Sequence, residues 1–349
     1  MSSASITDAA TGPAPWRLRG ACRTLAGGWQ TFFHAPCDAR VAAAVRIAFA
    51  MVMLLGLAIL YPDLDLWFTD AGVLPQDASR EVAPPQTWSI FWQVPATEAA
   101  VRICFWIAVT QAVCLLLGLA SNLNMLCLFV WLMSIENRNF LIIDGEDRVL
   151  RMLAFMLIWA PLGRCWSVDS LVRRWWKGSG VNCGQELSTL QERGPQLTED
   201  PLVSVASRYA APGWGLRLVQ IEICLVFFSA GLCKLGGDAW IDGTALYYVA
   251  RLDDYFGRFP TPAWPFDSPW AVAAMTWSVI AVELLAPVFI WFKETRRITL
   301  AVVVLFHLAN EWTMHLFLFH WVMLTGWLAF VSPSDFAWLG RLFRKSKSA

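Results

Sequence analysis

Apolar residues fall in long, nearly uninterrupted runs along this chain. An α-helix needs about 20 apolar residues to cross the hydrocarbon core of a bilayer. Four windows have that length, at residues 41–61, 99–120, 214–234 and 270–292. The pattern therefore predicts membrane-spanning helices and no strand-rich soluble domain.

Two further apolar regions bring the predicted total to about eight spans. In the first, the polar segment 144–147 separates the apolar stretches 123–143 and 148–162. The second, 298–331, has 34 positions, too many for one crossing, so we place a tight turn near residues 310–315. The predicted fold class is an all-α, polytopic integral membrane helix bundle of about eight transmembrane helices.

Lys and Arg are concentrated on alternate loops. The segments before residue 41, at 163–213, at 293–297 and after 332 contain 4, 6, 3 and 4 of them, whereas 62–98 and 235–269 contain 1 and 2. The positive-inside rule places the first group, and hence both termini, in the cytoplasm. Seven crossings would put the basic C-terminal residues outside, which the same rule disfavours. We therefore expect a cytoplasmic segment 1–40, a transmembrane domain 41–331 and a basic cytoplasmic tail 332–349.

The composition narrows the class of partner. Hydrophobic residues make up 57% of the chain and charged residues 15%, which is more apolar than a soluble domain and favours membrane lipids as partners. Lys plus Arg, 27, equals Asp plus Glu, 27, so there is no net field to attract a nucleic acid. The nine cysteines include no CxxC pair, so neither a disulfide framework nor a metal site is predicted. Many of the 21 tryptophans lie where apolar runs end, as in the aromatic belts of membrane proteins.

The loops have different predicted roles. Residues 62–98 and 235–269 combine aromatic and acidic side chains, so we expect both outer loops to fold onto the bundle. The inner loop 178–213 is rich in Gly, Ser, Gln and Glu and reads as a mobile connection. Just before it, residues 171–177 interleave apolar and basic side chains, which suits a short helix in the membrane interface.

Ionisable residues within the apolar runs are candidate functional residues, because a charge inside a bilayer costs free energy. Glu222 and Glu283 are predicted to share a depth on consecutive spans. They form a pair of buried acids that binds a cation or positions a base, or each one pairs with a neighbouring helix and stabilises the bundle.

The densest polar cluster lies between the third and fourth spans. It comprises Glu136, Arg138, Asn139, Asp144, Glu146 and Asp147. One interpretation is a structural seam in which Arg138 pairs with Asp144 or Asp147. The other is an outward-facing polar pocket, for which a broken helix is the usual construction.

Two other groups add candidates. His307, Glu311 and His315 recur every fourth residue and are expected on one helix face, where the histidines are too far apart for one metal ion and suit a polar face or a proton path. Lys234 ends the fifth span beside glycines. It is a snorkelling anchor, or a desolvated amine that acts as a base.

These residues also carry a family resemblance. The run Phe228–Leu235, followed by Asp238, Trp240 and Asp242–Leu246, resembles the signature of the horizontally transferred transmembrane (HTTM) domain family. That family is related to the transmembrane part of vitamin K-dependent γ-glutamyl carboxylase. Further matching motifs are Trp166–Asp169, Phe68–Pro75, and Glu283 with Pro287. The resemblance runs from about residue 40 to 330 and includes the family's bacterial members, which implies the bacterial inner membrane.

The resemblance implies an intramembrane enzyme that resembles the carboxylase, in which carbon–carbon bond formation follows deprotonation of a reduced quinone. Lys234 would be the base acting on reduced vitamin K, another quinone or another lipid-soluble substrate at the outer face. The catalytic set would be Lys234, Arg138, Asn139 and Asp147; Arg138 and Asn139 stand where the carboxylase has a histidine. The expected substrate or cofactor pocket comprises Asp144, Trp240, Glu283, His307 and Glu311. A secreted or membrane protein or peptide is the implied substrate, with no metal.

Two other functions fit the same residues. The chain would serve as a non-catalytic maturation, immunity or lipid-binding partner of a secreted protein if the outer loops recognise that protein and Lys234 is only an anchor. A transporter is the third candidate, because Glu222 and Glu283 could carry protons, although matched interrupted helices are missing from the sequence pattern.

Overall fold

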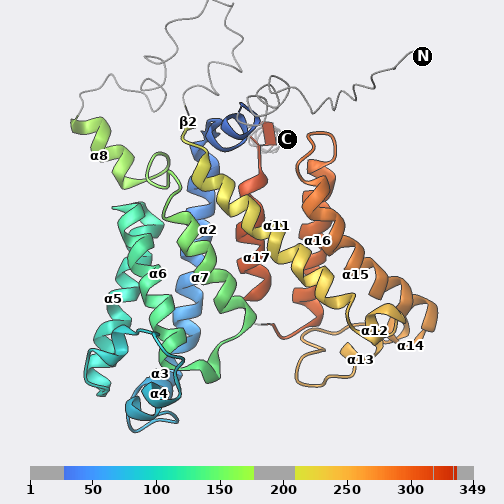
Figure 1. The fold of residues 1–349 in the computed structure, drawn as a ribbon, viewed down its shortest axis with the longest axis horizontal. Helices are drawn as coiled ribbons and strands as arrows, with labels where there is room; N and C mark the ends of the chain where they lie inside the picture. Colours follow the sequence, from blue (N-terminus) through green and yellow to red (C-terminus); the bar gives the residue numbers. More distant parts are fainter. Residues whose placement is uncertain (1–26, 177–208, 317, 333, 336–349) are drawn as a thin grey trace, which may run out of the picture.

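A computed structural model describes residues 27–176, 209–316, 318–332 and 334–335 (Figure 1). The described chain is almost entirely helical, which confirms the all-α class. Its two strands, β1 (Cys37–Asp38) and β2 (Ala210–Ala211), are two residues each and pair antiparallel. The predicted mobile connection 178–213 lies mostly outside the described residues.

Eight helices run back and forth between two ends of the bundle (Figure 1). They are α2 (Ala39–Leu60), α5 (Glu98–Leu117), α6 (Ser121–Arg138), α7 (Gly145–Leu157), α11 (Trp214–Lys234), α15 (Pro269–Phe289), α16 (Arg296–Thr313) and α17 (Phe319–Trp327). We call the end that holds β1, β2 and α8 (Val168–Trp176) the strand end, and the opposite end the loop end. α11 crosses the bundle obliquely, from the middle of the strand end to one side of the loop end.

Short elements make up the loop end. Between α2 and α5 these are η1 (Tyr61–Asp63), α3 (Leu64–Phe68), α4 (Gln76–Val82) and η2 (Ile90–Trp92). η3 (Phe140–Ile142) joins α6 to α7, and α12 (Asp238–Ile241), α13 (Ala245–Val249) and α14 (Trp264–Asp267) join α11 to α15. At the strand end, η4 (Leu328–Phe330) continues α17.

Four helical segments of the described chain are long and apolar enough to cross a membrane. They are Ala39–Phe68, Glu98–Leu117, Trp214–Lys234 and Pro269–Phe289, and they coincide with the four clear apolar windows. α6, α7, α16 and α17 run alongside them but do not meet the same length and hydropathy limits. The C-terminal apolar region does divide near the expected turn, but a total of eight spans stays a prediction.

Helix ends follow local capping chemistry. The Thr97 hydroxyl accepts the Ala100 N–H at the start of α5, and Gly118 ends that helix in the left-handed conformation with φ 73°. α7 begins with a reciprocal capping box, in which the side chains of Asp144 and Asp147 each accept a backbone N–H of the other residue.

A buried corner joins α2, α5 and α8 at the strand end. Arg46 is fully buried and donates to the carbonyls of Leu162 (2.9 Å) and Trp166 (2.6 Å). The Asp169 carboxylate accepts the N–H groups of Ala120 and Ser121, the first at 2.8 Å. The motif Trp166–Asp169 therefore has a structural role, because its contacts hold the start of α8 against Arg46 and against the turn between α5 and α6.

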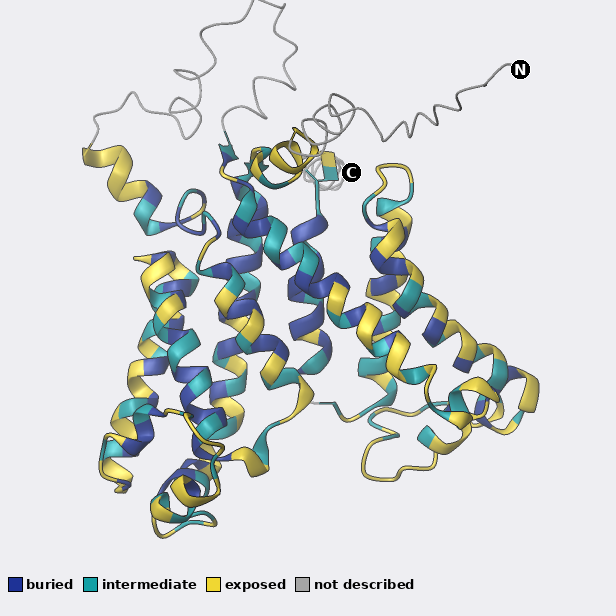
Figure 2. Cartoon of the chain, viewed as in Figure 1, coloured by how far each residue is buried: buried dark blue, intermediate teal, exposed yellow. Residues whose placement is uncertain are grey.

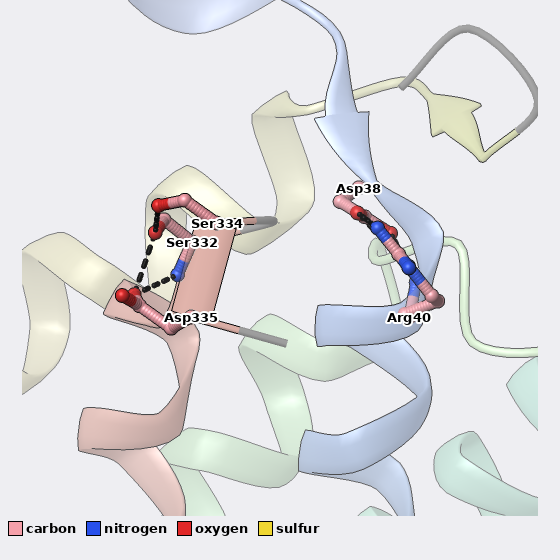
Figure 3. Close-up of polar contacts among 5 residues, drawn as sticks. All are labelled: Asp38, Arg40, Ser332, Ser334 and Asp335. Carbon is pink, nitrogen blue, oxygen red and sulfur yellow. Dashed lines mark hydrogen bonds and ion pairs between the residues drawn. The ribbon is translucent and has the colours of Figure 1, made fainter. Parts of the chain in front are cut away.

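Further polar contacts tie the chain together at the strand end (Figure 3). Asp38 caps α2 by accepting the Arg40 N–H, and the two side chains form an ion pair of 2.5 Å. Asp335 accepts the N–H of Ser332 at 2.9 Å and pairs with Arg297 at 2.7 Å. Side-chain caps thus satisfy backbone groups that a helix end leaves unpaired.

The core lies where α2, α5, α6, α7, α11 and α17 pack together. Figure 2 shows buried residues on the facing sides of these helices and exposed residues on the outer sides. Many exposed residues are large and apolar, for example Ile103, Leu123, Leu225 and Ile298. An apolar outer surface is expected of helices surrounded by lipid.

The loop at residues 62–98 packs onto the bundle as predicted, and α8 is a helix, while its position in the membrane interface stays a prediction. Phe68, Phe91 and Trp92 of the first outer loop are buried against the bundle. α8 exposes Trp175 and Trp176, at 82% and 79%, as expected of a helix that lies in the membrane interface.

Candidate functional site

The centre of the candidate site is Lys234, at the end of α11. Its Nζ lies 2.7 Å from Oε1 of Glu283 on α15. Gly231 allows this approach, because a Cβ there would lie 2.7 Å from Leu284. The indole ring of Trp240 lies beside the amine, 5.2 Å from Nζ to the ring centroid. Two of the expected pocket residues therefore do surround Lys234.

The lysine is more accessible than its partner. The Lys234 side chain is 23% exposed and that of Glu283 is 9% exposed. The second oxygen of Glu283, Oε2, is buried and has no hydrogen-bond partner. The pair therefore offers a partly exposed amine beside a carboxylate that has one free acceptor oxygen.

The structure does not pair Glu283 with Glu222. Gly231, which approaches the Cβ of Glu283, lies nine residues after Glu222, about 13 Å along the helix. Both carboxylate oxygens of Glu222 are buried without a hydrogen-bond partner. The predicted acid pair is not formed, although α11 packs against α15, because Glu283 pairs with Lys234 of α11 instead.

Arg138 and Asn139 anchor the first outer loop. Arg138 is fully buried and donates to the carbonyls of Leu74 (2.8 Å) and Phe68 (3.2 Å). Asn139 donates to the carbonyl of Trp67 at 2.9 Å. The predicted ion pair of Arg138 with Asp144 or Asp147 is not formed: Nη2 donates to the loop carbonyls, and the buried Nε and Nη1 have no partner.

The acidic half of the seam has other partners. Glu136 pairs with Arg151 of α7 at 3.0 Å. An ion pair therefore does join α6 to α7, but residues other than the predicted pair form it. Asp144 and Asp147 form the capping box of α7. These two predicted site residues thus have a structural role at the helix start.

His307 pairs with His320, which is not one of the residues predicted for the site. Its Nδ1 lies 3.1 Å from Nδ1 of His320 on α17, and both side chains are buried. Both Nε2 atoms lack a partner. His315 follows the end of α16, so the expected common helix face of His307 and His315 is not formed.

Glu311 anchors the second outer loop. Its Oε1 lies 2.6 Å from Nη1 of Arg258. The same loop also contacts the end of α16 through its backbone, since the His315 N–H donates to the Tyr255 carbonyl at 2.8 Å. No sequence pattern indicated Arg258, because it is one of two basic residues in the long segment between α11 and α15.

The predicted site therefore separates into distinct groups. Figure 1 places the end of α11 beside α12, α13 and α14, whereas the junction of α6 and α7 lies beside α3 and α4 on the other side of the loop end. Among the described residues, no hydrogen bond or ion pair joins Lys234 to Arg138, Asn139 or Asp147. Among the predicted residues that the structure describes, Lys234, Glu283 and Trp240 form one contact group, and Asp144 and Asp147 form another. The described residues also include no cluster of three or more His, Cys, Asp or Glu residues that could hold a metal ion.

Comparison with known proteins identifies the family for the part of the chain that carries Lys234. Residues 201–335 match the HTTM domain. This part of the chain is thus similar to the HTTM domain. The match confirms the family predicted from the motifs around Lys234, while its extension over residues 41–200 stays a prediction. With the four spanning helices, it indicates an integral membrane protein.

Two proteins of Bacillus subtilis are similar to parts of this chain. Uncharacterized protein YitO is 24% identical over 137 residues, which are 37% of this chain and 44% of YitO. Sporulation-delaying protein SdpB is 27% identical over 124 residues, which are 34% of this chain and 38% of SdpB. The similarity thus covers less than half the length of either relative. No solved structure matches the chain.

Proposed function

We propose that this HTTM protein is a carboxylase-like intramembrane enzyme that uses Lys234 as a base on a reduced quinone or another lipid-soluble substrate. The observation that carries the proposal is the 2.7 Å contact between Lys234 and Glu283, with a free oxygen on the carboxylate. We place the site in the bacterial inner membrane, at the outer face, with both termini in the cytoplasm.

The pair has the chemistry that a base in a membrane requires. In a medium of low dielectric constant an ion pair is costly, so Glu283 can take up the ammonium proton when a substrate binds and leave a neutral amine. The neutral Nζ can then accept a proton from a substrate hydroxyl. A reduced quinone would supply that hydroxyl. Trp240 beside Nζ offers an aromatic face against which a flat ring can stack.

Mass spectrometry of the small molecules that copurify with the protein tests whether the site binds such a substrate. We expect a quinone or another lipid-soluble aromatic molecule with the wild type, and its loss from Lys234→Ala. Lys293→Ala is the matched control, because Lys293 is exposed at the strand end. An unchanged set of bound molecules in Lys234→Ala would contradict the proposed site.

The second candidate function is a non-catalytic maturation, immunity or lipid-binding partner of a secreted protein. Exposed aromatic side chains on the second outer loop favour it, among them Tyr248, Tyr255 and Trp264. Photo-crosslinking from Tyr248 and Trp264 should then capture one defined protein or peptide. Capture of lipid or quinone alone would exclude this function.

A further inference from the structure

A cavity lies away from Lys234, between α2, α6, α7 and α17. Its volume is about 290 Å³. Apolar side chains from all four helices line it, including Met53, Leu57, Leu132, Ile135, Leu150 and Val322. A ligand held there must therefore have an apolar part.

The charged residues that line this cavity are all acidic. Asp63 comes from η1, and Asp144, Glu146 and Asp147 come from the start of α7. The described lining includes no Lys, Arg or His. The carboxyl groups of this set that are ionised repel an anionic ligand and attract a cationic one.

One residue that lines the cavity has a buried donor without a partner. Trp131 of α6 lines the cavity and is only 6% exposed. Its indole Nε1 has no hydrogen-bond partner. Because a buried donor without a partner costs free energy, a ligand with an acceptor oxygen would gain affinity by accepting this N–H.

We propose that this cavity binds a single-chain amphiphile that has an ammonium head group and an amide or ester carbonyl. The ammonium group lies among Asp63, Glu146 and Asp147, the chain fills the apolar part, and the carbonyl oxygen accepts the Trp131 N–H. Neither Lys234 nor Glu283 lines the cavity, so the proposal does not depend on the proposed enzyme activity.

Three radiolabelled probes with the same acyl chain test the charge requirement. They are the lauric acid monoamide of ethylenediamine, lauroyl ethanolamine and lauroylglycine, which carry positive, zero and negative charge at neutral pH. Binding is measured on the full-length protein in phosphatidylcholine nanodiscs, with empty nanodiscs subtracted. We expect the cationic probe to bind about tenfold more tightly than the neutral probe, as for a charge-assisted contact, and the anionic probe most weakly.

Two variants assign this preference to the cavity. Asp63→Asn should reduce the advantage of the cationic probe over the neutral one, because it removes one carboxylate. Trp131→Phe keeps an aromatic ring but removes the donor, so it should weaken all three amide probes by a similar factor of about five.

Lys234→Ala separates this proposal from the proposed enzyme. It should leave the binding of all three probes unchanged even where it abolishes quinone binding. Equal affinity for the three probes, or a charge preference that survives in Asp63→Asn and in Glu146→Gln, would overturn the proposed site.

Discussion

At the scale of single residues, the sequence predicted candidate side chains but not their partners. Lys234, Glu283 and Trp240 were all candidates, yet Lys234 and Glu283 are 49 residues apart and the sequence pattern paired Glu283 with Glu222. Arg138 was expected to meet a carboxylate. Its actual partners are backbone carbonyls, which no residue pattern can reveal because every residue has one.

The Lys234–Glu283 pair makes a prediction about stability. Lys234→Ala leaves a buried carboxylate without its cation, so the free energy of unfolding should fall by about 3 kcal/mol. Lys234→Ala with Glu283→Gln removes both charges and should recover most of that loss. A denaturant series on the two single variants and the double variant measures the coupling, and purely additive effects would show that the two side chains do not interact.

Glu146 lies outside the predicted spans and makes a prediction about pH. Burial, followed by the negative charges of Asp147 and Asp144, raises the pKa of Glu146 to about 7. The folded protein therefore retains a proton that the unfolded chain has lost above its ordinary pKa, and stability contributed by this group falls as the pH rises from about 4.5 towards 7. The unfolding temperature of Glu146→Gln should vary less over this interval than that of the wild type. An identical pH profile would contradict the shifted pKa.

At the scale of elements, long apolar runs predicted the four clear spans because hydrophobic length is a property of one segment. The shorter helices were harder to predict, since α7 and α17 obtain part of their burial from neighbours rather than from their own length. Corners are also decided by contacts between segments. Gly118 ends α5 with φ 73°, and a Cβ there would lie 2.4 Å from both Arg46 and Ser167.

Gly118→Ala should therefore disturb the corner at the strand end. We expect a loss of about 2 kcal/mol or more in the free energy of unfolding, from the left-handed backbone and from displacement of Arg46. Gly145→Ala is the matched control, since no atom lies within 4 Å of a Cβ at that position. Equal stability of the two variants would contradict the described packing.

At the scale of the whole molecule, the distribution of Lys and Arg over the loops predicts the orientation of the protein in the membrane. The spanning helices form the framework of the bundle. The all-α class follows directly from the apolar runs. The division of the predicted site into separate groups could not be inferred, because the order of helices around a bundle is set by packing between distant segments. The sequence pattern therefore predicted a single site for residues that lie on different sides of the loop end.

Reporter fusions test the orientation. Alkaline phosphatase, which is active only outside the cytoplasm, should be active when fused after Asp253 and inactive when fused after Lys293 or at the C-terminus. Fusions to green fluorescent protein should give the opposite pattern. An active phosphatase at the C-terminus would support seven crossings in place of eight.

The rate at which the purified protein consumes a quinol tests whether Lys234 acts as a base on this substrate. Wild type, Lys234→Ala, Glu283→Gln and Lys293→Ala are compared in nanodiscs with a reduced naphthoquinone, carbon dioxide and oxygen. We expect turnover by the wild type and by Lys293→Ala, and a reduced rate in Glu283→Gln. In Lys234→Ala the rate should fall at least about a hundredfold, as expected when a general base is removed. Full turnover by Lys234→Ala would contradict the role of Lys234 as a base.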